Sequence, residues 1–161
     1  MHEVMSAWVV GVGGKYEEGP LKTRARVAQK TYTDYDNDPL FVVDIVRGTA
    51  IFVSMFQLCI ALESLLSDEC ELVVVRAKDR LNKPTSFGYM DLLLNVHLAS
   101  GPHSHHIGEL QLHLEGIHAI KPLTHRTYGI LRTGTAGLRA RVRVCIGACV
   151  LACLLACLLA R

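Results

Sequence analysis

The chain has 161 residues, a length that builds one domain of ordinary size rather than two. Its formal net charge is only +2, from 17 basic and 15 acidic residues, so no overall basic field points to a nucleic-acid partner. Four of the six cysteines fall in one apolar C-terminal run, which is not the spacing of a disulfide framework.

Residues 1–19 are expected to form an extension before the folded domain. Their apolar part is short and lacks a basic leader, so it does not predict a signal peptide, and we expect a cytoplasmic protein. A helix is predicted for residues 20–35, which contain no internal breaker and begin with a proline. Lys22, Arg26 and Lys30 are spaced four residues apart, which lines three cations along one helix face, either as a binding face or as a solvated one.

Residues 40–53, LFVVDIVRGTAIFV, are rich in β-branched side chains and predict a strand. Asp44 interrupts this apolar run. Because an unpaired buried carboxylate is costly, we expect Asp44 to lie at the exposed end of the strand, to pair with Arg47, or to act as a ligand. Ser54 and Gln57 then form a capping-box pattern that predicts a helix, and residues 72–75 predict the next strand.

The stretch from residue 89 to 114 shows the strongest pattern in the chain. Two runs alternate between apolar and polar residues, with the polar turn ASGPHSHH between them, and this predicts a β-hairpin. Leucines and valines occupy one face. The opposite face is either solvated or a binding surface, and its residues are Tyr89, Asp91, Asn95, His97, Glu109, Gln111 and His113.

The sequence after residue 114 is predicted to be helical, with Pro122 starting or kinking a segment. Residues 133–143 read as an arginine-containing linker, and residues 144–160, VCIGACVLACLLACLLA, carry no charge. That run lies at the lower limit, about 17 to 25 residues, for a membrane helix. Three explanations stay open: a membrane anchor, a buried or partner-bound helix, and a disordered tail.

The order of these elements predicts one α/β (α+β) domain over residues 20–132, with a mixed β-sheet whose apolar side is covered by helices.

Four blocks of the sequence resemble, in order, the synthetase domain of the RelA/SpoT guanosine tetraphosphate enzymes. The blocks are DIVRGTAIF, KDRLNKPTSFGY, GELQLHL and HRTY. The resemblance implies a nucleotidyltransferase-like fold and a GTP/GDP pyrophosphokinase, which transfers pyrophosphate from ATP to the guanosine 3′-hydroxyl. It implies Mg²⁺ as cofactor, held by Asp44 and Glu109 as the catalytic residues, with Lys78 and Lys83 at phosphates and Tyr89 stacked on guanine.

The remaining candidate nucleotide-binding residues are Arg47, Asn95, Gln111 and His125. Lys22, Arg26 and Lys30 are candidate substitutes for the family's upstream phosphate-binding run, which is not found before Pro20. Leu93 stands where the family usually has a histidine. Two alternatives to the enzyme therefore remain, a catalytically silent nucleotide-binding or regulatory module and a membrane-tethered interaction domain.

Overall fold

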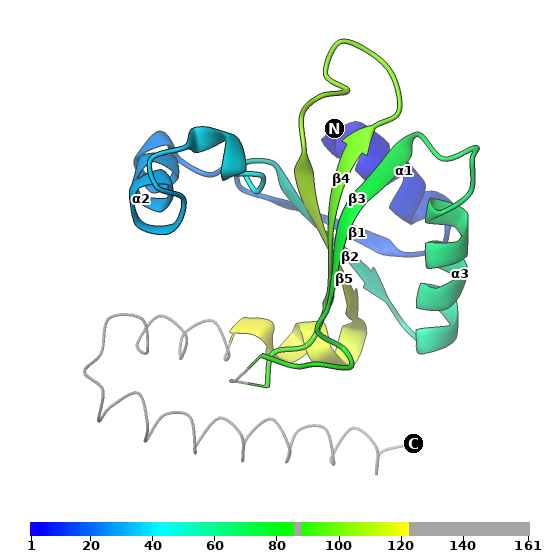
Figure 1. The fold of residues 1–161 in the computed structure, drawn as a ribbon. Coiled ribbons are helices and arrows are strands. Elements are labelled where there is room, and N and C mark those ends of the chain that lie inside the picture. The colour runs from blue at the N-terminus through cyan, green and yellow to red at the C-terminus, as the bar shows by residue number, and fades with distance from the viewer. Residues whose placement is uncertain (86–87, 123–161) are drawn as a thin grey trace.

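The computed structural model describes residues 1–85 and 88–122 as a five-stranded sheet with helices on both of its sides (Figure 1). Residues 115–122 form a helix that follows the last strand. The other elements, in chain order, are α1 (His2–Gly11), β1 (Lys15–Gly19), α2 (Arg24–Asp34), the 3₁₀ helix η1 (Pro39–Phe41), β2 (Arg47–Phe52), α3 (Met55–Leu65), β3 (Leu72–Asp79), β4 (Leu92–Leu98) and β5 (Gly108–Leu114).

The sheet has the strand order β1-β2-β5-β4-β3. β2 and β5 are parallel, and the other neighbouring pairs are antiparallel, so the predicted mixed α+β sheet is confirmed. The predicted hairpin is also confirmed, because β4 pairs with β5 and Asn95 lies opposite Glu109. β5 is thus placed between β2 and β4, in the middle of the sheet.

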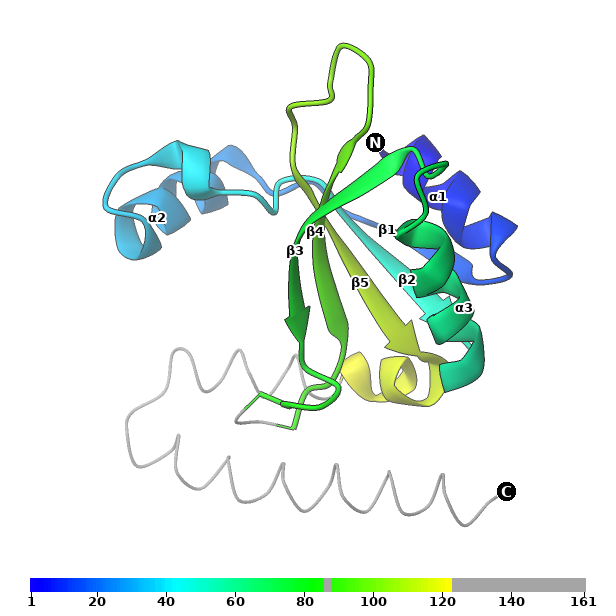
Figure 2. The same ribbon diagram turned by 45° about the vertical axis from the view of Figure 1, so that its right-hand side comes forward.

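The core lies on the leucine face of the sheet. Leu110, Leu112 and Val96 are fully buried there, as the alternation predicted. α1 and α3 cover this face, whereas α2 lies on the other side of the sheet (Figures 1 and 2). Full burial of a side chain of this size contributes about 1.5 to 3 kcal/mol, so a few such residues hold the helices against the sheet.

The N-terminal residues differ from the expected extension, because they are built into the fold. Met5 and Val9 of α1 are fully buried in the core. β1 forms one edge of the sheet, where Lys15 pairs with Ile51 of β2. The folded unit therefore includes residues that the sequence pattern assigned to a separate segment.

α3 begins where the capping pattern predicted. The Ser54 hydroxyl accepts a hydrogen bond from the Gln57 backbone N–H at 3.2 Å. The Gln57 side chain donates to the Gly13 carbonyl at 2.6 Å, which connects α3 to the turn between α1 and β1. Gly13 has a φ of 78°, a conformation that glycine adopts without strain.

The segment around Asp44 departs from the predicted long strand. The strand is limited to Arg47–Phe52, the residues that pair with β5, and all of them except Phe52 also pair with β1. Asp44 instead lies in the connection between η1 and β2. The predicted helix starts later than expected, at Arg24, where the Thr23 side chain accepts from the Arg26 N–H.

No helix within residues 1–85 and 88–122 is long and apolar enough to cross a membrane. The domain end at residue 132, the linker, the apolar run 144–160 and His125 all lie outside the described residues.

Candidate functional site

The face of the sheet opposite α1 and α3 is polar. We call its central part the sheet floor, which consists of Thr49, Asn95, Glu109, Gln111 and His113. The strand register places these side chains side by side, because Thr49 pairs with Gln111 and Asn95 pairs with Glu109. Directly opposite residues in a sheet project to the same face. The predicted polar face is therefore a continuous surface made by three neighbouring strands.

Gln111 is the centre of the sheet floor. Its Nε2 donates to Glu109 Oε1 at 2.8 Å. Its Oε1 accepts from Lys121 Nζ at 3.1 Å and from the Tyr89 hydroxyl at 3.4 Å. One amide group thereby connects a carboxylate, an ammonium and a phenol that come from three separate segments of the chain.

Lys121 reaches the floor from the 115–122 helix. Besides Gln111, its Nζ lies 3.4 Å from Thr49 Oγ1 and 3.5 Å from His113 Nε2. Burial lowers the pKa of Lys121, although the carboxylates of Asp91, Glu17 and Glu109 act to raise it. A partly desolvated cation beside oxygen acceptors is suited to meet the phosphate of a ligand.

His113 is fully buried at the end of the floor. Burial, followed by the nearby charge of Lys121, lowers the pKa of His113 to about 3, so the ring is neutral at physiological pH. Its Nε2 lies 3.1 Å from the Tyr89 hydroxyl. Because the Lys121 ammonium only donates, Nε2 is the acceptor, and we assign the ring proton to Nδ1.

An ion pair between Arg80 and Asp91 borders the floor. Arg80 donates two hydrogen bonds to the Asp91 carboxylate, which is fully buried. The same guanidinium lies over the Tyr89 ring, 5.3 Å from its centroid. Burial raises the pKa of Tyr89 above its ordinary value, and the charge of Asp91 adds to this effect. Tyr89 is therefore a neutral hydrogen-bond donor with a fixed ring.

Two lysines clamp Asp44. Its Oδ2 accepts from Lys22 Nζ at 2.6 Å and from Lys30 Nζ at 2.9 Å, and we call these three residues the lysine clamp. Burial acts to raise the pKa of Asp44, but the hydrogen bonds and charges of the two lysines outweigh it, and the pKa lies below its ordinary value. Asp44 Oδ1 is buried and has no hydrogen-bond partner among the described residues.

Of the three alternatives for Asp44, the pairing with Arg47 is wrong, because the ion pairs of Asp44 are with the two lysines. Arg47 instead donates from Nη2 to the Pro20 carbonyl at 2.9 Å. Arg26 also departs from the expected row of three cations, since it is exposed and donates to Gln29 of its own helix.

The other candidate residues occupy different positions. Tyr89, Glu109 and Gln111 meet on the sheet floor, as described above. Asn95 is buried and accepts from Arg76 Nε at 2.8 Å, which is a structural contact. Lys78 is exposed on β3 opposite Leu93, and Lys83 is exposed in the connection from β3 to β4.

Asp44 and Glu109 are brought near one another by the backbone, since Glu109 N–H donates to the Val46 carbonyl at 2.9 Å. Their carboxylates have different partners in the structure, the two lysines for Asp44 and Gln111 for Glu109. Within the described part of the chain, no group of three or more histidine, cysteine, aspartate or glutamate side chains is arranged to hold a metal ion.

The donor set nevertheless fits Mg²⁺. This ion prefers oxygen ligands and is commonly held by one or two carboxylates together with substrate phosphates and water. Asp44 Oδ1 is a buried carboxylate oxygen with no partner in the described part of the chain, and Glu109 offers a second carboxylate close to the start of β2. These are the two residues that would hold the ion.

The site residues assigned from the sequence did not include Arg80, Asp91, His113 and Lys121. The alternating pattern placed Asp91 and His113 on the polar face, and that pattern was the available signal for them. The sequence gives no comparable signal for Lys121, because its position depends on how the chain turns from β5 into the next helix.

No protein-family model and no curated protein matches the chain. Solved structures do match. Small alarmone synthetase 2 from Bacillus subtilis has a TM-score of 0.66 at 16% identity, over 91% of this chain and 81% of that chain. Small alarmone synthetase 1 from Bacillus subtilis, bound to its product pppGpp, has a TM-score of 0.65 at 16% identity, over 83% and 71%.

The chain has the alarmone synthetase fold. A GTP pyrophosphokinase family protein from Streptococcus pneumoniae also matches this fold, with a TM-score of 0.61 at 10% identity over 86% of this chain and 70% of that chain. The nucleotidyltransferase-like architecture implied by the four sequence blocks agrees with this finding.

Proposed function

We propose that the chain binds ATP together with GTP or GDP and transfers pyrophosphate from ATP to the guanosine 3′-hydroxyl. The observation that carries the proposal is the sheet floor, where Glu109, Gln111 and Tyr89 meet beside the Lys121 ammonium. The fold supports the proposal, because small alarmone synthetase 1 has been solved with pppGpp and with AMPCPP bound.

Each of these groups has a role in the proposed reaction. Tyr89 supplies an aromatic surface for guanine. Lys22, Lys30 and Lys121 would offset the charge of the phosphates, and the two clamp lysines would exchange Asp44 for phosphate oxygens as ATP binds. Mg²⁺ held by Asp44 and Glu109 would polarise the transferred group and offset its developing charge.

The transfer balances as a displacement at phosphorus. The guanosine 3′-oxygen forms a bond to the β-phosphorus of ATP, and the bond from that phosphorus to the oxygen bridging the α- and β-phosphates breaks. AMP leaves with that oxygen. The proton of the 3′-hydroxyl passes to the Glu109 carboxylate, whose orientation is fixed by the hydrogen bond from Gln111.

A catalytically silent nucleotide-binding module is the second candidate, and one specific observation favours it. Leu93, at the position where the family usually has a histidine, is 7% exposed and offers no polar group to a substrate. A chain that has the sheet floor and the lysine clamp but lacks this histidine would bind nucleotide without transferring pyrophosphate. The membrane-tethered interaction domain depends on residues 144–160, which lie outside the described residues.

The test uses the full chain and two measurements. Thermal unfolding is followed with Mg²⁺ and GDP, GTP or AMPCPP, because a ligand that binds the folded state raises the unfolding temperature according to its concentration and Kd. Product formation is then measured with radiolabelled ATP and GTP or GDP. Asp44→Asn and Glu109→Gln are expected to weaken both signals, while the control variants Asp34→Asn and Glu63→Gln, both exposed, leave them unchanged.

The outcomes separate the candidates. A magnesium-dependent shift together with labelled pyrophosphorylated guanosine supports the enzyme. A shift without product identifies the silent module. No shift with any nucleotide removes the nucleotide proposal altogether.

A further inference from the structure

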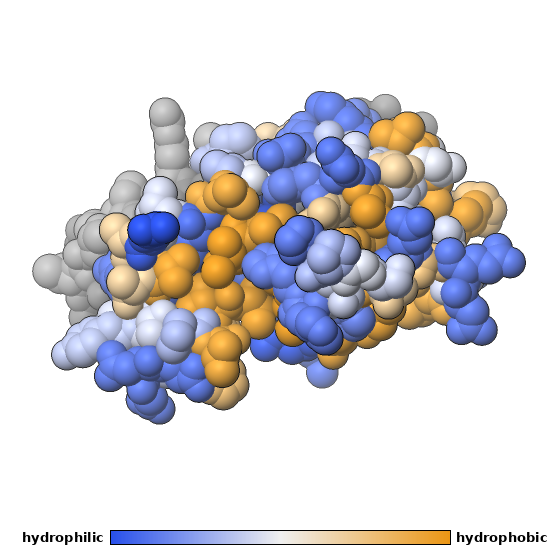
Figure 3. Space-filling model, turned by 90° about the horizontal axis from the view of Figure 1, so that it is seen from above, coloured by the Kyte–Doolittle hydropathy of each residue, from blue (hydrophilic) through white to orange (hydrophobic). Residues whose placement is uncertain are grey.

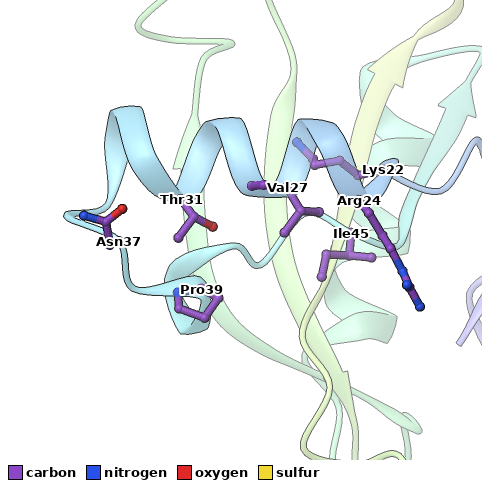
Figure 4. A pocket seen from close by; sticks show the side chains of 8 residues that line it. Lys22, Arg24, Val27, Thr31, Asn37, Pro39 and Ile45 are labelled. Atoms are coloured by element: carbon purple, nitrogen blue, oxygen red, sulfur yellow. The ribbon is translucent and has the colours of Figure 1, made fainter.

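A pocket lies along α2, next to Lys22 of the lysine clamp. It is formed between α2 and the returning segment from residue 37 to 45, and its volume is about 600 Å³ (Figure 4). α2 has no buried residue, so this side of the helix is not filled by the protein itself. Val27, Ala28, Pro39 and Ile45 supply apolar walls.

The pocket and Lys30 of the clamp use different parts of the α2 surface. Arg24, Val27, Ala28 and Thr31 are three or four residues apart and share one helix face. Lys30 is not part of this face, and it contacts Asp44. Of the residues assigned to the proposed nucleotide site, those that line the pocket are limited to Lys22.

Two polar residues, Thr31 and Asn37, line the pocket. Thr31 Oγ1 is buried and has no hydrogen-bond partner among the described residues. Asn37 lies across from it at the rim, in a left-handed conformation with a φ of 67°, and its backbone N–H donates to the Thr31 carbonyl at 3.0 Å. In Figure 4 the side chains of Thr31 and Asn37 lie at one end of the pocket, and Val27 points toward Ile45.

The charge at the other end is positive. Arg24 extends past Ile45 at the open end of the pocket (Figure 4) and is exposed. Lys22 contributes its aliphatic stem to the wall, because its ammonium holds Asp44. No carboxylate is found among the described residues that line the pocket. A ligand with one negative charge would therefore meet a guanidinium without a competing anion.

We propose that this pocket binds a small ligand with a flat apolar body and one anionic group, such as an aromatic carboxylate or sulfonate. The body lies between Val27 and Ile45, and the anion pairs with Arg24. The Asn37 amide bonds to a polar atom at the ligand's other end. The site is separate from the proposed nucleotide site and adjoins it through Lys22.

The test is a titration of the full chain with 1-anilinonaphthalene-8-sulfonate, which combines an aromatic body with a sulfonate. We expect one saturable site per chain. Arg24→Gln should weaken binding about tenfold, since it removes a charge-assisted contact. Ala28→Arg should abolish it by filling the pocket. The matched controls are Arg26→Gln, on the opposite helix face, and Phe56→Ser, an exposed apolar residue of α3 that is 75% exposed.

Both controls should bind the dye as the wild type does. Unchanged binding by Arg24→Gln, or loss of binding by Phe56→Ser, would mean that the dye binds exposed apolar side chains, and the proposal would be wrong. Arg24 is exposed, so its replacement does not threaten folding, and circular dichroism checks the other variants.

Magnesium ATP should leave the dye's Kd unchanged, because competition would make the pocket part of the nucleotide site. The dye titration tests the pocket independently of whether the chain binds ATP.

Discussion

Lys121 Nζ lies 3.1 Å from Oε1 of Gln111, and this contact joins the 115–122 helix to the central strand of the sheet. The amide of Gln111 can offer its oxygen to Lys121 only if its nitrogen points the other way, toward Glu109. The Gln111 amide thereby links Lys121 to the Glu109 carboxylate.

Replacing Lys121 by methionine is expected to separate function from stability. The substitution removes a charge whose burial is unfavourable, so we expect stability to change by about 1 kcal/mol or less. Nucleotide binding should weaken by about tenfold or more, because a cation near the phosphates is lost. Thermal unfolding with and without magnesium nucleotide measures both effects. Lys15→Met, at a lysine whose side chain is 73% exposed, is the control. A large loss of stability with unchanged ligand binding would contradict the assigned role.

His113 predicts a pH dependence of stability. Its pKa is about 3 in the folded protein and 6.5 in an unconstrained chain, so between these values only the unfolded state binds the proton. Stability should therefore fall as the pH is lowered from 6.5 toward 3, by about 1.4 kcal/mol for each unit. Urea unfolding between pH 7 and pH 4 measures this slope. The variant His113→Gln should have a flatter slope over the same range, and an equal slope in both proteins would refute the assignment.

Asp44→Asn is expected to loosen α2. The two lysines would lose their charged partner, at a cost of about 1.5 kcal/mol for the local structure. Hydrogen exchange of the α2 amides should accelerate accordingly, whereas amides of β5 should not change. Because the pKa of Asp44 is lowered in the folded state, the contribution is present above about pH 3.8 and is lost at lower pH. Asp34→Asn, at an exposed residue of the same helix, is the control and should change exchange little.

The stability effects of replacing Arg80 and Asp91 are expected to be strongly non-additive. Arg80→Leu leaves a fully buried carboxylate without its cation, which costs about 3 to 5 kcal/mol. Adding Asp91→Asn removes the charge, so the double variant should be more stable than Arg80→Leu alone. Denaturant unfolding of the wild type, both single variants and the double variant gives the coupling energy. Additive losses would show that the pair does not act as a unit.

The sequence predicted the hairpin and its core because alternation is a local signal. Leu110 and Leu112 face the core and Gln111 faces the floor wherever the strand is placed in the sheet. The helix at Ser54 was predictable for the same reason, since capping depends on residues three apart.

Signals that depend on distant partners were misleading. The apolar run around Asp44 resembles a strand along its whole length, but Val42 is buried in a connection rather than in the sheet. The strand begins only where β1 and β5 provide partners. Helical spacing grouped Arg26 with Lys22 and Lys30, yet only the last two reach Asp44. Which of these cations contact Asp44 depends on where the fold places its carboxylate, and helical spacing alone does not determine that position.

The central position of β5 has a consequence for how the chain folds. β5 is the last described strand in the sequence, and it joins two strand pairs, β1–β2 and β3–β4, that share no other neighbour in the sheet. Its parallel pairing with β2 closes a long loop, which is an intrinsically slow step. The same strand carries Glu109, Gln111 and His113. The two halves of the sheet therefore unite in the same event that assembles the floor, and an intermediate in which β5 is still undocked would have neither a complete core nor a place for a nucleotide.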